Sequence, residues 1–447
     1  MKVCLISLGC DKNLADSEIM ISILKEYGHE MVELEAEAEV IVINSCCFIN
    51  DAKEESINTI LECGQLKESN LKYLIVAGCL AQRYQTEIQE AIPEVDAIIG
   101  TSAYADIAEV IQNLENNLKA EKAKQVYIRE ADYLPRITVK RGHYTGTAYA
   151  YLKIAEGCNK HCTYCVIPGI RGPFRSIPME RVLEEAAELA KQGVKELILV
   201  AQETTLYGID IYGEKMLPRL LEELCKIEGP EWIRLMYCYP EEITDELIAV
   251  IKKEKKIVNY LDMPVQHASD EVLKRMGRRT NQKELKEQIR KLRKEIPDIV
   301  LRTSLITGFP GETDSDFEEL CDFVREIKFD RLGVFTYSKE EGTPAAKLKP
   351  QITQKVKKQR RNSIMRIQQE IAFERAKERI GTVIDVQIEG AIPEEEIYVA
   401  RGYMDAPNVD GYVFVKGTKG KLSGSIIPVR ITGAKGYDLI AEEIITE

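Results

Sequence analysis

Short apolar runs rich in β-branched residues alternate with helical patterns along most of this chain, and this alternation constrains its fold most strongly. From residue 2 to about residue 115 the runs are KVCLISLGC, AEVIVINSCCF, KYLIVAGCLA and VDAIIGTSA, separated by stretches such as DSEIMISILKEYG. Strands that alternate with helices form a parallel sheet whose faces the helices cover. We therefore expect an α/β protein that begins with a doubly wound parallel-sheet domain at residues 1–135.

The same alternation returns in the middle of the chain. The strand-like runs there are TAYAYLKIAEG, ELILVAQETT, IRLMYCYP, YLDMPVQHA, IVLRTSLITGFPG and RLGVFTYS. Six β/α units are too few to close an eightfold barrel, so we expect an open (β/α)6 partial barrel at residues 140–375. Beyond it, glycine-punctuated runs such as GYVFVKG and SIIPVRITGAKG indicate a small antiparallel β-barrel at residues 378–447.

Composition indicates the cellular location of the protein and the kinds of partner it can bind. Only Met1-Lys2 precede the first apolar run, and no apolar stretch approaches the roughly 18 residues of a membrane span, so we expect no membrane partner and a cytoplasmic location. In that reducing compartment, twelve cysteines are better explained as metal ligands, catalytic groups or core filler than as disulfides. A net charge of −12 argues against a nucleic-acid footprint over the whole surface.

Three cysteines crowd into the stretch EGCNKHCTYCVIP, at Cys158, Cys162 and Cys165. They follow the first strand of the partial barrel, at the carboxyl end of the sheet where β/α barrels place their chemistry. The spacing C-x3-C-x2-C suits an iron–sulfur cluster, whereas zinc would need a fourth ligand near by. His161 is a strained choice because its neighbour Cys162 is already a ligand. We interpret the trio as holding a cluster with one open iron, with a chance grouping as the alternative.

A second trio is spread over the first domain. Cys10, Cys46 and Cys79 each stand where an apolar strand run ends. The ends of parallel strands lie side by side, so these three thiols are expected to converge on a second cluster with an open iron. Cys47 remains an alternative to Cys46, since strand ends read from sequence are uncertain by about two residues. The remaining cysteines fit core positions: Cys4, Cys63, Cys225, Cys238 and Cys321.

The cysteine loop of the partial barrel, with Tyr164 before its last cysteine, resembles the radical S-adenosylmethionine superfamily. In that superfamily the open iron binds S-adenosylmethionine, and an electron from the reduced cluster cleaves the sulfonium to give a 5′-deoxyadenosyl radical. The resemblance implies that Cys158, Cys162 and Cys165 are catalytic and that Tyr164 belongs to the cofactor site.

Two cysteine trios on successive α/β domains resemble the methylthiotransferase family over essentially the whole chain. The matching stretches are SLGCDKNLADSE, INSCCFI, VAGCLAQRY, YLDMPVQHASDEVLKRMGR and SLITGFPGETDSDFEEL. The family order is a cluster domain, a radical S-adenosylmethionine barrel and a TRAM barrel. By this resemblance Cys10, Cys46 and Cys79 hold an auxiliary 4Fe-4S cluster that carries the sulfur. A second 4Fe-4S cluster cleaves S-adenosylmethionine, another S-adenosylmethionine supplies the methyl group, and a flavodoxin or ferredoxin is the implied electron donor.

Members of this family differ in substrate: some modify a hypermodified adenosine of tRNA, and another branch modifies an aspartate β-carbon of small-subunit ribosomal protein twelve. A tRNA-binding TRAM barrel should be basic. Residues 382–447 hold six Lys and Arg against eleven Asp and Glu, a net charge of −5, which favours a basic ribosomal protein. Lys12, Asn13 and Asp16 also resemble the ribosomal-protein branch, although Asp11 stands where that branch has proline. The tRNA substrate remains the alternative.

Other polar residues are weaker candidates. Gln202 and Glu203 end the second strand of the barrel, Gln266 ends the fourth, and Arg302 flanks the fifth, so all four are placed to face a cofactor. A satisfied polar residue that caps a helix or braces a loop is the alternative for each. The run QKVKKQRR is expected to be a solvated helix face, with an RNA contact as the alternative. An electron-transfer protein or an RNA-binding module would each explain only part of these features.

Overall fold

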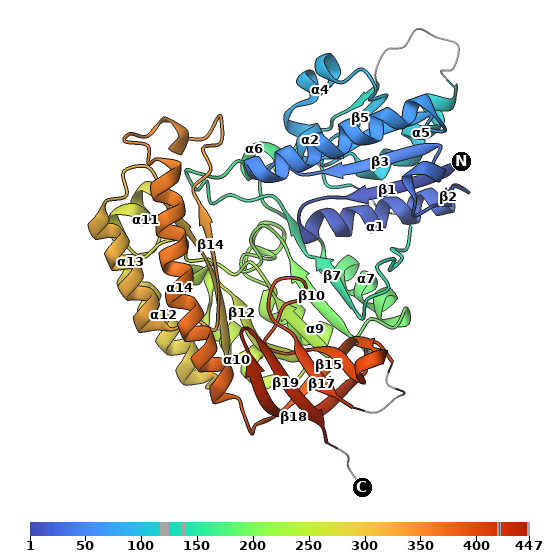
Figure 1. Cartoon of the computed structure of the whole chain (residues 1–447). Coiled ribbons are helices and arrows are strands. Elements are labelled where there is room, and N and C mark those ends of the chain that lie inside the picture. Colours follow the sequence, from blue (N-terminus) through green and yellow to red (C-terminus); the bar gives the residue numbers. More distant parts are fainter. Residues whose placement is uncertain (117–124, 136, 138, 418–419, 421, 445–447) are drawn as a thin grey trace.

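The computed structural model describes residues 1–116, 125–135, 137, 139–417, 420 and 422–444. The chain forms three units in sequence, and the first and the last both pack against the central one (Figure 1). Lys419, Lys421 and Glu447, which contribute to the C-terminal charge count, lie outside the described residues. Among the described residues, none of the helices combines the length and the apolar composition that crossing a bilayer requires.

The N-terminal unit is a parallel sheet with helices on both faces. Its strands are β1 (Lys2–Ser7), β2 (Glu30–Met31), β3 (Val40–Ser45), β4 (Tyr73–Gly78), β5 (Ala97–Ile99) and β6 (Gln125–Tyr127). They pair in the order β2-β1-β3-β4-β5-β6, all parallel. Every residue of β3 and β4 is buried, as expected for strands covered on both faces. The predicted doubly wound domain is confirmed.

Helices cover the two faces of this sheet. They are α1 (Asp11–Glu26), α2 (Asn50–Gln65), α3 (Cys79–Arg83), α4 (Gln85–Ala91) and α5 (Ile107–Asn116). Apolar side chains of α1 and α5 share one core cluster with the sheet, and side chains of α2, α3 and α4 share the other. Both faces of the sheet are therefore excluded from water, and the open carboxyl edge is left for a site.

The central unit is an open sheet of six parallel strands. These are β7 (Tyr149–Lys153), β10 (Glu196–Val200), β11 (Trp232–Leu235), β12 (Ile257–Asp262), β13 (Val300–Thr307) and β14 (Arg331–Thr336). Their order is β14-β13-β12-β11-β10-β7, the order of the chain itself, as in a partial barrel. The expected (β/α)6 partial barrel is confirmed.

Helices pack on the outer face of this sheet. They are α7 (Met179–Lys191), α9 (Leu217–Cys225), α10 (Asp245–Lys253), α12 (Gln282–Glu295), α13 (Asp314–Ile327) and α14 (Gln354–Glu378). Shorter elements line the carboxyl end: β8 (Ala155–Glu156), α6 (Ile167–Arg171), β9 (Arg175–Ser176), α8 (Ile209–Tyr212) and α11 (Asp270–Met276). The long α14 runs beside α13 and along β14 toward the C-terminal barrel (Figure 1).

The C-terminal unit is a closed barrel of β15 (Val383–Ile392), β16 (Ile397–Gly402), β17 (Val413–Lys416), β18 (Ile426–Lys435) and β19 (Asp438–Glu443). Neighbouring strands are antiparallel except β17 and β19, which are parallel. The expected barrel is therefore antiparallel in all but one pair. A ring of five strands cannot alternate direction all the way round, so closure requires at least one parallel pair.

This barrel closes the amino end of the central sheet. The first residues of β7, β11 and β13, namely Tyr149, Trp232 and Val300, share one core cluster with the barrel interior. The barrel loop at residues 403–412 lies in the same place, where the Arg234 side chain donates to the Tyr403 carbonyl oxygen at 2.7 Å. The cysteine loop lies at the opposite, carboxyl end of the sheet, which the barrel leaves free.

Candidate active site

The first cysteine trio lies at the carboxyl ends of three adjacent strands. Cys10 caps α1 just beyond β1, Cys46 directly follows β3, and Cys79 begins α3 directly after β4. Because β1, β3 and β4 are neighbours in the sheet, the three turns come together as predicted. Gly9 has φ +86°, and a Cβ at this position would lie 2.5 Å from the Cys46 Cβ, so only glycine lets the two turns approach this closely.

Cys46 and Cys47 have different surroundings. Cys47 is completely buried in an apolar cluster that also contains Cys63 and Cys79, whereas Cys46 contacts the turn of Gly9 next to Cys10. Burial, with smaller contributions from the nearby thiols of Cys79 and Cys10, raises the pKa of Cys46 to about 11. Consecutive extended residues point to opposite sides, so only one of the pair faces the other two turns. The geometry favours Cys46, and its role as a ligand stays a prediction.

The second trio occupies the loop between β8 and α6. Cys158 and Cys162 are buried and Cys165 is partly exposed. The Lys160 backbone N–H lies 3.5 Å from the Cys158 Sγ, and the Tyr239 hydroxyl lies 3.8 Å from the Cys162 Sγ. Polar hydrogens directed at sulfur are typical of cluster ligands, whose potential such contacts tune.

The thiols of Cys158 and Cys165 fit ligands better than free nucleophiles. Burial raises the pKa of Cys158 to about 11 and that of Cys165 to about 12, with neighbouring cysteines adding to the shift at Cys165. Such thiols are protonated at neutral pH, and a bound cation is needed to displace the protons. Within the described residues, no three His, Cys, Asp or Glu side chains stand at single-ion spacing. His161, the other possible ligand in this loop, is exposed.

Buried polar atoms without partners mark the wall next to this loop. Gln202 donates to the Glu156 carboxylate at 2.7 Å, but its own carbonyl oxygen accepts no hydrogen bond within the described part of the chain. The same holds for Oε2 of Glu203, which is 3.9 Å from the Lys160 ammonium. Burial raises the pKa of Glu203 to about 7. Buried polar groups are normally hydrogen-bonded, so these two oxygens are free to accept hydrogen bonds from a bound cofactor.

The other predicted cofactor residues have varied environments. Tyr164 packs edge-to-face on Phe309, with ring centroids 6.5 Å apart. Gln266 lies beyond the end of β12 with φ +71°, and its backbone bridges to Leu305 of β13. The Arg302 guanidinium donates to Asp262 at 2.6 Å, so its charge is balanced within the protein.

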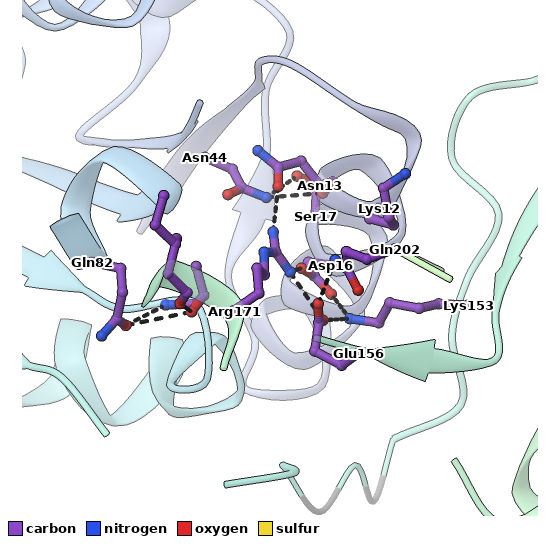
Figure 2. Close-up of polar contacts among 12 residues, drawn as sticks. Lys12, Asn13, Asp16, Ser17, Asn44, Gln82, Lys153, Glu156, Arg171 and Gln202 are labelled. Carbon is purple, nitrogen blue, oxygen red and sulfur yellow. Dashed lines mark hydrogen bonds and ion pairs between the residues drawn. The ribbon is translucent and has the colours of Figure 1, made fainter. Parts of the chain in front are cut away.

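A group of buried charges joins the two cysteine sites, and the sequence predicted only part of it. Figure 2 shows Arg171 directed at Asp16 of α1 and at Glu156, each 3.0 Å away. Lys153 lies 3.0 Å from Glu156 and also pairs with Asp16. Lys153 and Glu156 were not predicted, but they could have been recognised as charged residues inside the apolar run TAYAYLKIAEG. Arg171 is likewise the only charge in the stretch CVIPGIRGPF, but nothing in that stretch pointed to the other cysteine site.

An open sheet of six β/α units, with a C-x3-C-x2-C loop after its first strand, defines a radical S-adenosylmethionine enzyme. Residues 152–324 match the radical SAM superfamily, residues 2–100 match the uncharacterized protein family UPF0004, and residues 380–444 match the TRAM domain.

Whole-chain relatives specify the class further. The ribosomal protein uS12 methylthiotransferase RimO of Lachnoclostridium phytofermentans is 60% identical over 441 residues, covering 98% of this chain and 99% of the relative. The protein of the same name from Alkaliphilus oremlandii is 52% identical over 443 residues, covering 99% of each. The chain therefore belongs to the radical S-adenosylmethionine methylthiotransferase family, and it is an enzyme.

Solved structures share the fold at low sequence identity. The radical S-adenosylmethionine methyltransferase TsrM from Kitasatospora setae, with cobalamin and a [4Fe-4S] cluster bound, has a TM-score of 0.57 at 13% identity, covering 77% of this chain and 73% of that chain. The cobalamin-dependent S-adenosylmethionine radical enzyme OxsB, with aqua-cobalamin and S-adenosylmethionine bound, has a TM-score of 0.51 at 13% identity, covering 82% and 56%.

Proposed function

We propose that this enzyme inserts sulfur and a methyl group, as SCH3, at the β-carbon of an aspartate in a small-subunit ribosomal protein. The observation that carries the proposal is the presence of two cysteine trios, at the carboxyl ends of two adjoining sheets, linked by one buried charge network. The whole-length relatives are named as methylthiotransferases of ribosomal protein uS12, which supports the same substrate for this chain.

Each trio has a distinct part in this proposal. Cys158, Cys162 and Cys165 hold the 4Fe-4S cluster that supplies the electron for cleaving S-adenosylmethionine. Cys10, Cys46 and Cys79 hold the second 4Fe-4S cluster, which carries the sulfur. The unpartnered oxygens of Gln202 and Glu203 are hydrogen-bond acceptors available to the N–H groups of the S-adenosylmethionine amino group.

The surface charge of the C-terminal barrel favours a protein substrate over tRNA. Asp405 and Asp410 are directed inward, where they lie beside Arg331 and Arg302. The run Glu394–Glu396 is exposed and keeps the outer surface acidic, which complements a basic ribosomal protein.

The basic run of α14 gives little support to an RNA contact. Lys357 is buried and donates to the Tyr337 carbonyl oxygen at 2.7 Å. Arg360 is buried 2.7 Å from the Glu312 carboxylate. Two of the five cations in this run are therefore parts of the fold rather than a solvated face, and neither is available to phosphate.

The proposal also covers the domain boundaries, the electron donor and the cellular location of the enzyme. The functional units are residues 1–135, 140–375 and 378–447, the last being the TRAM domain. The electron donor is a flavodoxin or a ferredoxin, and the enzyme acts in the cytoplasm, where ribosomal proteins are available.

Anaerobic reconstitution followed by a mass measurement tests the function. The enzyme is incubated with dithionite, S-adenosylmethionine and either purified ribosomal protein uS12 or bulk tRNA. We expect two clusters per chain by iron and sulfide analysis, and a mass gain of one methylthio group on an aspartate of the protein. The variant with Cys158, Cys162 and Cys165 replaced by alanine is the control and should transfer nothing. Modification of tRNA alone would overturn the substrate, and one bound zinc would overturn the mechanism.

A further inference from the structure

Arg171 belongs to the central domain, yet its guanidinium lies in the cysteine site of the N-terminal domain. We propose that Arg171 is a positioning residue that sets the reduction potential of the cluster held by Cys10, Cys46 and Cys79. The inference rests on the proposed function, because it takes that cluster as given. It assigns to one domain the electrostatic control of a cofactor held by another.

The short helix α6 carries Arg171 from one cysteine site to the other. It begins two residues after Cys165 and ends at Arg171, and five helical residues span about 7 Å. The N-terminal domain holds its last turn: the Thr101 hydroxyl donates to the Ile170 carbonyl oxygen at 2.9 Å, and the Thr101 N–H donates to Gln82 at 3.0 Å (Figure 2).

Close packing fixes the end of this helix. Gly172 has φ +72°, and a Cβ at this position would lie 2.3 Å from the Ala131 carbonyl oxygen. The Gly172 carbonyl oxygen accepts the Cys158 N–H at 3.1 Å. The backbone beside Arg171 is therefore attached to the cysteine loop on one side and to the N-terminal domain on the other.

The guanidinium reaches the residue that ties the N-terminal turns together. Arg171 donates to the Asn13 side-chain oxygen at 2.5 Å. The Asn13 amide in turn donates to the Leu8 carbonyl oxygen at 2.9 Å and to that of Ser45 at 3.1 Å, just before the turns of Cys10 and Cys46.

The charges around Arg171 are balanced and shielded from water. Arg171 and Lys153 face Asp16 and Glu156, and each of the four side chains is at most 7% exposed. Loss of the Arg171 charge leaves this group at −1, and loss of the Glu156 charge leaves it at +1. A charge is felt strongly in such a low-dielectric setting. The cluster gains one negative charge on taking an electron, so a nearby cation favours the reduced form.

The network also extends to the cofactor wall. Glu156, which pairs with Arg171, accepts a hydrogen bond from Gln202 at 2.7 Å.

A purely structural role for Arg171, as an interface ion pair, predicts a similar loss of stability for any change among the four charged residues. The electrostatic role instead predicts opposite shifts in potential for removing a cation and removing an anion.

Redox titration of the N-terminal cluster alone tests the inference. The full chain with Cys158, Cys162 and Cys165 replaced by alanine is reconstituted anaerobically, so that only the other trio can hold a cluster. Dithionite supplies one electron per cluster, and the paramagnetic reduced form is followed by electron paramagnetic resonance. Three variants are compared in this background: Arg171→Met, Arg171→Lys and Glu156→Gln.

We expect Arg171→Met to lower the equilibrium constant for reduction about tenfold, a shift of about 59 mV to more negative potential for one electron. Glu156→Gln should shift the potential in the opposite direction, and Arg171→Lys should stay close to the parent. Shifts of the same sign in Arg171→Met and Glu156→Gln, or unchanged potentials at full iron content, would overturn the inference. If Arg171→Met loses iron, its potential cannot be measured, and the potentials of Glu156→Gln and Arg171→Lys test the inference instead. A parent without any cluster would instead refute the cluster placement in the proposed function.

Discussion

The Tyr260 hydroxyl donates a hydrogen bond to the Asp410 carboxylate at 2.8 Å, joining a central strand to a loop of the C-terminal barrel. Asp410 also accepts the Ala406 N–H at 2.9 Å and lies 3.7 Å from the Arg302 guanidinium. The acidic loop is thus held against the base of the central sheet. Its carboxylates stabilise the contact between two units rather than facing a partner.

Asp410→Ala should destabilise this contact. The change leaves the Tyr260 hydroxyl and the Ala406 N–H without their acceptor, which costs about 3 kcal/mol in the free energy of unfolding. The single tryptophan, Trp232, is buried in the same interface, so its fluorescence during urea unfolding reports the loss directly. Asp385→Ala, on an exposed position of β15, is the control and should change stability by less than about 0.5 kcal/mol. Equal effects of the two changes would contradict the assignment.

Glu196→Gln should show a pH-dependent loss of stability. Burial raises the pKa of Glu196, but Arg234 and Arg401 outweigh burial and hold it below the ordinary value of 4.5. A depressed folded pKa adds stability above the unfolded pKa, and this contribution disappears as the pH falls through the folded pKa. The variant should be about 3 kcal/mol less stable than wild type at pH 7, because both arginines lose their buried anion. The difference should shrink below about pH 4.5. A gap that stays constant with pH would refute the ion-pair account.

Cys46→Ala and Cys47→Ala form a matched pair for the N-terminal cluster. Cys46→Ala should bind about half the iron and sulfide of the wild type after reconstitution, since only the other trio keeps its three thiolates. Cys47→Ala should keep the full iron content and lose about 1 kcal/mol of stability from the small cavity in the apolar cluster. The reverse pattern would show that Cys47 is the ligand.

Glu203→Gln should weaken binding of S-adenosylmethionine to the reconstituted enzyme. Glutamine is a weaker, uncharged acceptor for the N–H groups of the cofactor amino group, and a tenfold rise in the dissociation constant corresponds to about 1.4 kcal/mol. Because burial raises the pKa of Glu203 to about 7, wild-type affinity should fall as the pH drops below that value, whereas the variant should not respond. Equilibrium dialysis with labelled cofactor measures both. Glu231→Gln, an exposed change at the amino end of the sheet, should bind like wild type.

Local sequence pattern was sufficient for the large-scale architecture. Strand runs and helical periodicity depend on neighbouring residues, so the two parallel sheets and the C-terminal barrel were predictable. Which two strands form the parallel pair, β17 and β19, was not predictable, because the order of the strands around the closed barrel depends on tertiary structure. The net charge of the barrel was also countable in advance, but which carboxylates face inward was not: Asp405 is buried against Arg331, and only the fold reveals that.

The sequence by itself determined the order of the three units and membership of the family, and it predicted the two cysteine trios, because residue type, spacing and strand ends are local properties. Tertiary structure decided the orientation of Cys46 relative to Cys47, since one backbone torsion at a strand end selects the side. It also decided that Arg171 crosses from the barrel into the other cysteine site. Residues far apart in the chain meet there because α1 packs against β7 and α3 packs against α6, and no local pattern encodes these contacts between the two units.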